Sequence, residues 1–507
     1  MLQILQTVAY LFLSAVAIIL LLIIIAVFAY FKNKRKLSHL PGYCQFIPAQ
    51  LVKRNSFLSK YLYTNTEIVY SKVPEFIEKY GPVYKVVSAV GRPLIFITDG
   101  DFAKIITSKG YKLFEKDRNG SDKFHELFNG DNVFTVSDEV QWRKHRLLLN
   151  PAFTDDNLSD AVITFTNKTI QELMDKINKQ SNVREVSSDM SGLTLDIIGR
   201  AGFGYEFGCT DASSRKTELS LSEKTKSLMG SFPTYFLTPT KFVRQNLKVG
   251  SLKALHDCKD SFVSEIAAII AKRSKEGEEE AANDMLSLLL RAREEQGERF
   301  SDYELIANCF IMIVAGHETT SQTLSYALYL LAKHPHIQEE AYSFIKSKIP
   351  DHHSRSFNYI DYSENLSYIH NIFDETLRMY PVAVGVVRKL KSDLEFKGYK
   401  LPKDTAVFYN WSVEFVSEKN FTNPEQFIPN RWNDQGSGQN KIYTPFGIGN
   451  RSCIGKKFAK IESVLCLARL ICNYKISLKD PNYVMDTDVN VTMQPAKPFF
   501  AIFTKRQ

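Results

Sequence analysis

The chain has 507 residues, and 44% of them are hydrophobic, which is enough for a large buried core. Its net charge of +8 is mild, so it indicates no nucleic-acid partner and suits an anionic membrane surface or an acidic partner protein. The cysteines are irregularly spaced and contain no C-x-x-C pair, which argues against a zinc knuckle or a disulfide framework and favours a reducing compartment. They are Cys44, Cys209, Cys258, Cys309, Cys453, Cys466 and Cys472.

An uncharged apolar run, Val8–Phe31, lies near the start of the chain. It exceeds the roughly 20 residues with which a helix spans a bilayer. A cleaved signal peptide would be shorter and would carry positive charge ahead of the apolar run. Here the basic residues follow it: Lys32, Lys34, Arg35 and Lys36. The positive-inside rule therefore predicts a single-pass anchor over residues 1–36 and a cytosolic domain over residues 37–507, with a buried core helix as the alternative.

The body of the chain opens with short elements. Pro74–Tyr80 predicts a helix that stops before Gly-Pro, and Pro82–Asp99 predicts a β-hairpin that turns at Gly91. Residues 101–348 are mostly helix-patterned. Because no repeat and no long linker divides the body, the sequence predicts one large, mainly α domain with small β-sheets over residues 37–507.

Three segments have loop-like composition. Lys275–Glu280 is charged and predicts a solvated loop, and Gln435–Asn440 predicts a flexible loop. Gly230–Phe242 is aromatic, apolar and interrupted by prolines. It is either a loop that packs inward or a surface that dips into a membrane and admits apolar substrate.

A long helix is predicted between Ser301 and Pro335. Ser301 and Glu304 form an S-x-x-E capping box, and proline sets the far limit. The apolar middle is interrupted by "AGHETT", Ala315–Thr320. Gly316 lowers helix stability by about 1 kcal/mol relative to alanine, and a threonine hydroxyl can open a helix locally. The motif is therefore a groove with a proton relay or, alternatively, an exposed polar turn.

The stretch "FDETLRMYP" places an acid and a base on one helical face. Glu375 and Arg378 are three residues apart among apolar neighbours, and Arg431 in "FIPNRW" offers a second cation. A buried glutamate shared by two arginines would be a structural lock, because one charge left unpaired there costs several kcal/mol.

The loop "TPFGIGNRSCIGKKFA", Thr444–Ala459, holds a single cysteine, Cys453, just before a predicted helix. One interpretation is a buried thiol beside a turn. The other is a thiolate that holds a metal. Since no second protein ligand is spaced nearby, such a metal would have to belong to a cofactor.

Taken together, these motifs resemble the signature set of the cytochrome P-450 superfamily, the haem-thiolate monooxygenases. The cysteine loop matches F-x-x-G-x-R-x-C-x-G at Phe446, Gly449, Arg451, Cys453 and Gly455. "AGHETT" resembles the oxygen-activation motif and "ETLR" the ExxR motif, with Arg431 in the position of the partner arginine. "WRKHR" resembles the W-x-x-x-R of the C helix at Trp142 and Arg146. The resemblance covers nearly all of the body, and the anchor is similar to that of microsomal members.

The resemblance implies haem b as the cofactor, with Cys453 as the axial thiolate that favours O–O cleavage. Gly449 and Gly455 would let backbone approach the haem and aim N–H groups at the sulfur. Phe446 would shield the sulfur from water. The implied propionate partners are Trp142, Arg146, Arg388 and Arg451. Their alternative roles are those of ordinary surface cations and a core tryptophan.

The resemblance also assigns an acid–alcohol pair. Thr319 would hold dioxygen and water, and Glu318 would relay protons from solvent. The implied reaction inserts one atom of O2 into an apolar substrate, while the other atom leaves as water and NADPH supplies two electrons. Ala315 stands where the fatty-acid ω-hydroxylase branch often has glutamate, so covalent haem attachment by that route is not expected.

The sequence shows no flavin or nucleotide domain, so the electrons would come from a separate NADPH–cytochrome P-450 reductase, with cytochrome b5 as a second candidate partner. Lys144, Lys456 and Lys457 could form its basic docking face, or could be plain solvated lysines. The expected location is the endoplasmic reticulum membrane. Two rival functions, a haem-thiolate isomerase and a non-enzymatic haem or sterol binder, are disfavoured because Glu318 and Thr319 are both present.

Overall fold

The computed structural model describes residues 2–47, 52–53, 56–60, 62–88, 93–210, 228, 235, 238, 241–246, 250–274, 284–295, 300–433 and 442–507. The predicted hairpin turn at Gly91, both predicted loops at Lys275–Glu280 and Gln435–Asn440, and most of Gly230–Phe242 lie outside these residues.

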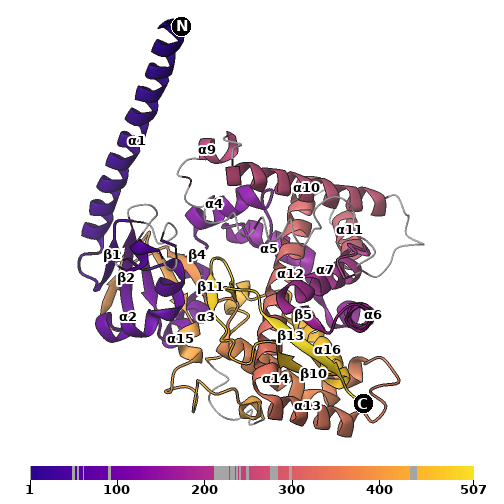
Figure 1. Ribbon diagram of the computed structural model, residues 1–507. Helices are drawn as coiled ribbons and strands as arrows, with labels where there is room; N and C mark the ends of the chain where they lie inside the picture. Colours follow the sequence, from indigo (N-terminus) through magenta and orange to yellow (C-terminus); the bar gives the residue numbers. More distant parts are fainter. Residues whose placement is uncertain are drawn as a thin grey trace.

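The body is mainly helical, as predicted. Its longer helices are α2 (Val73–Tyr80), α3 (Asp101–Leu113), α4 (Arg118–Leu127), α5 (Glu139–Leu149), α6 (Asp155–Lys179), α7 (Val186–Phe203), α10 (Gly250–Arg273), α11 (Met285–Glu295), α12 (Asp302–Lys333), α13 (Pro335–Lys348), α14 (Ser367–Met379) and α16 (Lys456–Asn473). The short helices are α9 (Lys241–Asn246) and α15 (Ser412–Phe415), and α1 (Leu2–Lys36) precedes the body. Figure 1 shows α1 extending away from the body.

The strands form small sheets. The largest has the order β1 (Gly42–Gln45), β2 (Val83–Ser88), β3 (Leu94–Ile97), β9 (Ala406–Asn410), β6 (Gly385–Leu390) and β4 (Phe114–Glu115). The second joins β10 (Tyr474–Leu478), β13 (Phe500–Lys505) and β5 (Val183–Glu185). Two further pairs are β11 (Thr487–Val489) with β12 (Met493–Pro495) and β7 (Leu394–Phe396) with β8 (Tyr399–Leu401). The antiparallel pairing of β2 with β3 confirms the predicted hairpin.

The helix α12 is the centre of the main core. The hydroxyl of Ser301 accepts the Glu304 N–H at 3.2 Å and the Glu304 carboxylate accepts the Ser301 N–H at 3.0 Å, so the predicted capping box is present. Helices α7, α10, α14 and α16 all pack on it. Burial on nearly every side explains why its sequence is apolar all round rather than on one stripe.

A second, smaller core lies between the six-stranded sheet and α3. Ile95 and Ile97 of β3 and Phe102 of α3 are fully buried there. Within the part of the chain whose side chains are placed, no helix has the length and apolar character needed to cross a bilayer. The anchor predicted from Val8–Phe31 therefore stays a prediction.

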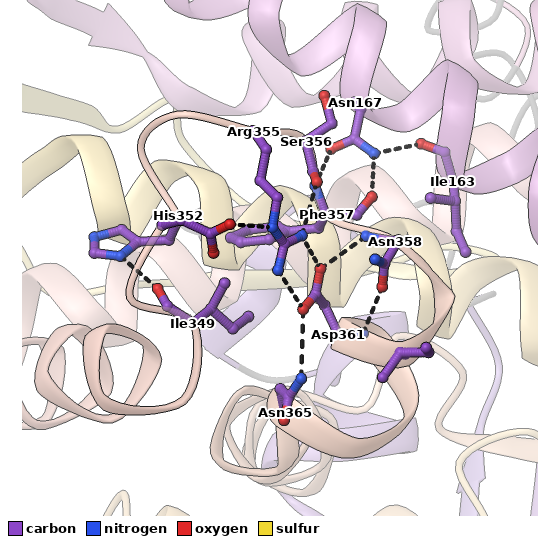
Figure 2. Close-up of polar contacts among 12 residues, drawn as sticks. Ile163, Asn167, Ile349, His352, Arg355, Ser356, Phe357, Asn358, Asp361 and Asn365 are labelled. Carbon is purple, nitrogen blue, oxygen red and sulfur yellow. Dashed lines mark hydrogen bonds and ion pairs between the residues drawn. The ribbon is translucent and has the colours of Figure 1, made fainter.

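The connection between α13 and α14 is fixed to α6 by polar contacts. Figure 2 shows Arg355 and Asn358 converging on Asp361, where Arg355 Nη2 donates at 3.0 Å and the Asn358 N–H donates at 3.0 Å. Asn167 of α6 donates to the Phe357 carbonyl at 2.8 Å and accepts the Phe357 N–H at 3.3 Å. The side chain of one buried asparagine thus holds the backbone of this loop against α6.

Candidate functional site

The loop that holds Cys453 is shaped by glycine and by its own backbone. Gly447 and Gly449 adopt φ values of 78° and 69°, which residues with a side chain rarely take. The Cys453 N–H donates to the Phe446 carbonyl at 2.8 Å. The Gly455 N–H bonds to the sulfur, and α16 begins with the next residue. The loop therefore places one backbone N–H on the sulfur, and the predicted approach of Gly455 to haem stays a prediction.

The Cys453 side chain is exposed although it lies deep among other residues. Burial by its surroundings raises the pKa of the thiol. The Gly455 N–H and the charges of Arg146 and Lys456 act in the opposite direction, because each favours the thiolate. The thiolate is the form that binds a metal.

The Phe446 ring is held beside this loop. It stacks on Phe373 of α14, with ring centroids 6.3 Å apart. Lys456 Nζ lies 5.8 Å from the centroid of the same ring. Its side chain is thus packed between α14 and the start of α16, and its predicted shielding of the sulfur stays a prediction.

The middle of α12 has an accessible face in an otherwise buried helix. Ala315 is exposed, and Gly316 and Thr319 are partly exposed. The Thr319 hydroxyl donates to the Ala315 carbonyl at 2.9 Å. The helix nevertheless continues without a break, so the predicted local opening at Gly316 is not seen. The hydroxyl adds a second hydrogen bond to a carbonyl of its own helix instead of replacing one.

Glu318 and Thr319 do not share a face. The Glu318 carboxyl group is buried and accepts a hydrogen bond from Gln322 Nε2 at 3.3 Å. Successive helical residues are about 100° apart around the axis, so the acid turns into the protein while the alcohol turns toward the accessible face. Their roles in proton transfer stay predictions.

A further carboxyl group, not among the predicted site residues, approaches the same turn of α12. Glu462 of α16 is fully buried, and burial raises the pKa of its carboxyl group well above the usual value. The nearby hydroxyl of Thr320 lowers the pKa, but less than burial raises it, and neither that hydroxyl nor the carboxyl oxygens form a hydrogen bond among the described residues. An acid within the apolar run "FAKIESVLCLARL" was the available signal. The contact also places the "AGHETT" turn beside the helix that follows Cys453.

Three cations gather on the other side of the cysteine loop. The pKa of Lys116 is lowered well below its usual value by burial and by the charges of Arg451 and Arg388. Burial and the charge of Arg451 lower the pKa of Arg388 to about 10. Burial lowers that of Arg451 to about 10, against the effect of Glu139 and Asp138. The three residues help to line a cavity of about 160 Å³.

Strand pairing explains this cluster. β4 runs antiparallel to β6 with Glu115 opposite Lys389, so the next residues along, Lys116 and Arg388, come side by side. Lys116 was not among the predicted site residues. Its segment "FEKDRNG" carries charges of both signs and no periodicity, so no local signal distinguishes it.

Trp142 and Arg146, both in α5, contact the cysteine loop from a third direction. Arg146 Nη1 donates to the Ser452 carbonyl at 3.1 Å, and its Nε donates to Asn150 at 3.0 Å. The Arg451 guanidinium lies over the Trp142 ring, 4.6 Å from its centroid. The structure thus brings Arg388 and Arg451 together, whereas Arg146 binds the backbone immediately before Cys453.

The predicted ion-pair lock is confirmed. Glu375 and Arg378 are fully buried and share two hydrogen bonds of 2.9 Å each. Arg431 Nε and Trp432 Nε1 also donate to Glu375, at 2.9 and 3.0 Å. Arg378 reaches the Phe415 carbonyl at 2.9 Å. The lock ties α14 to the segment ahead of the cysteine loop.

These residues fit an iron porphyrin. The group has an iron that takes a thiolate as axial ligand and two carboxylates that need cationic partners. The accessible Cys453 sulfur supplies the first. Lys116, Arg388 and Arg451 repel one another, and two carboxylates would neutralise most of that charge. The fold and the site together therefore define a mainly helical protein that would bind an iron porphyrin through a cysteine thiolate.

Comparison with known proteins makes this class specific. A family model described as Cytochrome P450 matches residues 53–503. The chain therefore belongs to the cytochrome P450 monooxygenase family.

Individual relatives are distant. The chain is 28% identical to Cytochrome P450 3A13 of Mus musculus over 441 residues, which cover 83% of this chain and 84% of that protein. It is 27% identical to Cytochrome P450 3A5 of Homo sapiens, over 84% of this chain and 85% of that one. A solved cytochrome P450 structure, CYP102L1, superposes with a TM-score of 0.74 at 22% identity, covering 92% of this chain and 99% of that chain. This last likeness concerns the fold.

Proposed function

We propose that this chain inserts one oxygen atom of O2 into an apolar small molecule of lipid, sterol or xenobiotic type. The other atom leaves as water, and two electrons come from NADPH. The observation that supports this most is the exposed Cys453, whose thiolate is favoured by the Gly455 N–H and by the charges of Arg146 and Lys456.

Haem b is the proposed cofactor, and when bound it supplies the redox chemistry that activates dioxygen. Cys453 would hold the iron, and Gly455 would stabilise the thiolate through its N–H. Lys116, Arg388 and Arg451 would pair with the propionates. Arg146 would have two roles. It would bind a propionate and would also hold the cysteine loop through its hydrogen bond to the Ser452 carbonyl.

Proton delivery is proposed for the accessible face of α12. Thr319 would hold water there through its hydroxyl, which already has Ala315 as an acceptor. Glu318 lies on a buried face, where it accepts a hydrogen bond from Gln322, so it would act through a change of side-chain rotamer or through water.

The proposed electron donor is a separate NADPH–cytochrome P-450 reductase, with cytochrome b5 as a second partner. Lys456 is exposed beside Phe446, whereas Lys144 pairs with Glu304 at 2.9 Å and is less available to a partner. Val140 and Leu147 of α5 are exposed as well, so a docking face here would combine positive charge with apolar contact.

A membrane location is part of the proposal. Residues 1–36 would anchor the chain in the endoplasmic reticulum as a single pass, with residues 37–507 in the cytosol. The support is the uncharged run Val8–Phe31 followed by four basic residues. Membranes washed with alkaline carbonate should retain the full chain and release a variant that lacks residues 1–36.

The first test is the reduced, carbon-monoxide-bound difference spectrum of the purified protein and of Cys453→Ser. We expect the long-wavelength Soret band of thiolate-bound haem in the wild type and its loss in the variant. NADPH consumption with added reductase should then be coupled to product. A wild-type spectrum of the shorter-wavelength kind, or NADPH consumption without product, would contradict the monooxygenase function.

A further inference from the structure

A buried asparagine in α12 joins the two segments that reach the cysteine loop. Asn308 is fully buried, seven residues before Ala315. Its Oδ1 accepts the Val133 N–H at 2.9 Å, from the segment between α4 and α5. Its Nδ2 lies 2.9 Å from His145 Nδ1 in α5 and donates to the Glu304 carbonyl at 2.7 Å. One amide therefore contacts three parts of the chain.

The hydrogen bonds fix the orientation of this amide. A backbone N–H can only donate, so the atom of Asn308 that faces Val133 must be the oxygen. The amino group then faces His145 Nδ1, which must act as the acceptor, and the imidazole carries its proton on Nε2. Burial lowers the pKa of His145, in agreement with a neutral ring. Nε2 faces Glu304 Oε1 at 3.7 Å.

Both segments lead directly to the cysteine loop. Three residues after Val133, the Val136 carbonyl accepts Arg451 Nη1 at 2.8 Å. Directly after His145, Arg146 reaches the Ser452 carbonyl at 3.1 Å. The guanidinium groups of Arg451 and Arg146 thus lie close in sequence to the Val133 backbone and the His145 side chain that Asn308 holds.

We propose that Asn308 is a positioning residue, which sets where Arg146 and Arg451 lie against the Cys453 loop. The proposal rests on the proposed haem-thiolate function, because its effect is read at the cysteine. It assigns no contact between Asn308 and cofactor or substrate. Its part in the reaction is to keep the thiolate loop and its cations in register with α12.

Asn167 offers a matched control. It too is buried, donates to the carbonyl four residues earlier in its own helix at 2.9 Å, and accepts a loop N–H (Figure 2). That loop joins α13 to α14, and its Tyr359 ring faces Lys457 of α16 rather than the backbone beside Cys453. Asn167→Leu and Asn308→Leu therefore remove comparable hydrogen bonds and differ in what those bonds position.

The first experiment compares the two variants as full-length holoproteins. Asn308→Leu should lower the share of haem with the thiolate spectrum and release haem to apomyoglobin about tenfold faster, a loss typical of outer-shell ligand partners. Asn167→Leu should lose comparable stability in urea without either change. If the two variants behave alike, the positioning role is wrong. If the wild type itself lacks the thiolate band, the proposed function fails first.

A second variant tests the mechanism through the proton on His145. Asn308→Asp keeps an acceptor for the Val133 N–H but also turns an acceptor toward His145 Nδ1, so that contact forms only when His145 carries a proton on Nδ1, as the imidazolium or as the other neutral tautomer. Glu304 and Asp131 favour the imidazolium, and Lys144 opposes it. The thiolate spectrum of Asn308→Asp should therefore be closer to normal at about pH 6 than at about pH 8. Asn308→Leu should show a defect at both pH values. An Asn308→Asp spectrum no better than that of Asn308→Leu at about pH 6 would overturn the proposed arrangement.

Discussion

The buried carboxyl group of Glu462 lies near the hydroxyl of Thr320, where α16 packs on α12. Glu462 is fully buried, and Thr320 opposes the effect of burial only in part, so the folded protein favours the neutral acid and the pKa of the carboxyl group is raised. Burying a carboxyl group is unfavourable unless it stays neutral. The stability of the protein should therefore respond to this one proton.

Glu462→Gln is expected to make the protein more stable at alkaline pH. The folded state holds the proton to a higher pH than the unfolded state, whose pKa is near 4.5. Unfolding above that pH therefore releases a proton, and the wild type loses about 1.4 kcal/mol of stability per pH unit from this group. Glutamine has no proton to lose.

Urea unfolding of both proteins at two pH values about two units apart, both above the usual range for a glutamate, measures this difference. The advantage of Glu462→Gln should grow with pH. Glu75→Gln on the exposed side of α2 is the control for loss of a surface carboxylate. A constant difference between wild type and Glu462→Gln would mean that Glu462 is ionised in the folded state.

Removing Glu375 should be far more damaging than removing an exposed partner. Glu375→Ala leaves the buried Arg378 without its carboxylate, at a cost of about 3–5 kcal/mol. Thermal unfolding of the holoprotein measures the loss. Asp257→Ala breaks the exposed Lys253–Asp257 pair of α10 and should change the midpoint little. Equal losses in the two variants would contradict the role of Glu375 as a lock.

The sequence predicts contacts between residues a few positions apart on one helix. It does not predict contacts between segments that are distant in the chain. Ser301 with Glu304, and Glu375 with Arg378, are three residues apart on one helix, so helical geometry alone brings them together. The convergence of Lys116 with Arg388 depends on the register of β4 against β6, which local composition does not encode. The separation of Glu318 from Thr319 reflects the helical angle, which the motif as a string of letters hides.

Lys116→Met is expected to weaken haem retention. Lys116 lies close to Arg388 and Arg451. Each of these cations would form an ion pair with a bound propionate and so replace the water that would otherwise solvate the carboxylate. Loss of one cation should speed haem transfer to apomyoglobin by about tenfold, while the folded protein before haem loading gains stability because repulsion falls. Lys104→Met, on an exposed lysine of α3, is the control. Slower haem transfer from Lys116→Met would contradict the assignment of Lys116 to the site.

Gly316→Ala should separate stability from activity. A Cβ at Gly316 would lie 3.5 Å from Ile198 Cδ1, an ordinary contact, so the substitution should gain about 1 kcal/mol of helix stability. The added methyl group also enters the partly exposed face that carries Thr319, and the turnover of substrate should fall. Gly204→Ala is the contrasting case, because φ there is 56° and the Cβ would lie 2.1 Å from Arg273 Nη2. Urea unfolding should give a higher free energy of unfolding for Gly316→Ala than for the wild type, and a lower one for Gly204→Ala. If stability and turnover both rise in Gly316→Ala, a methyl group at position 316 does not obstruct the site, and the glycine is not required there.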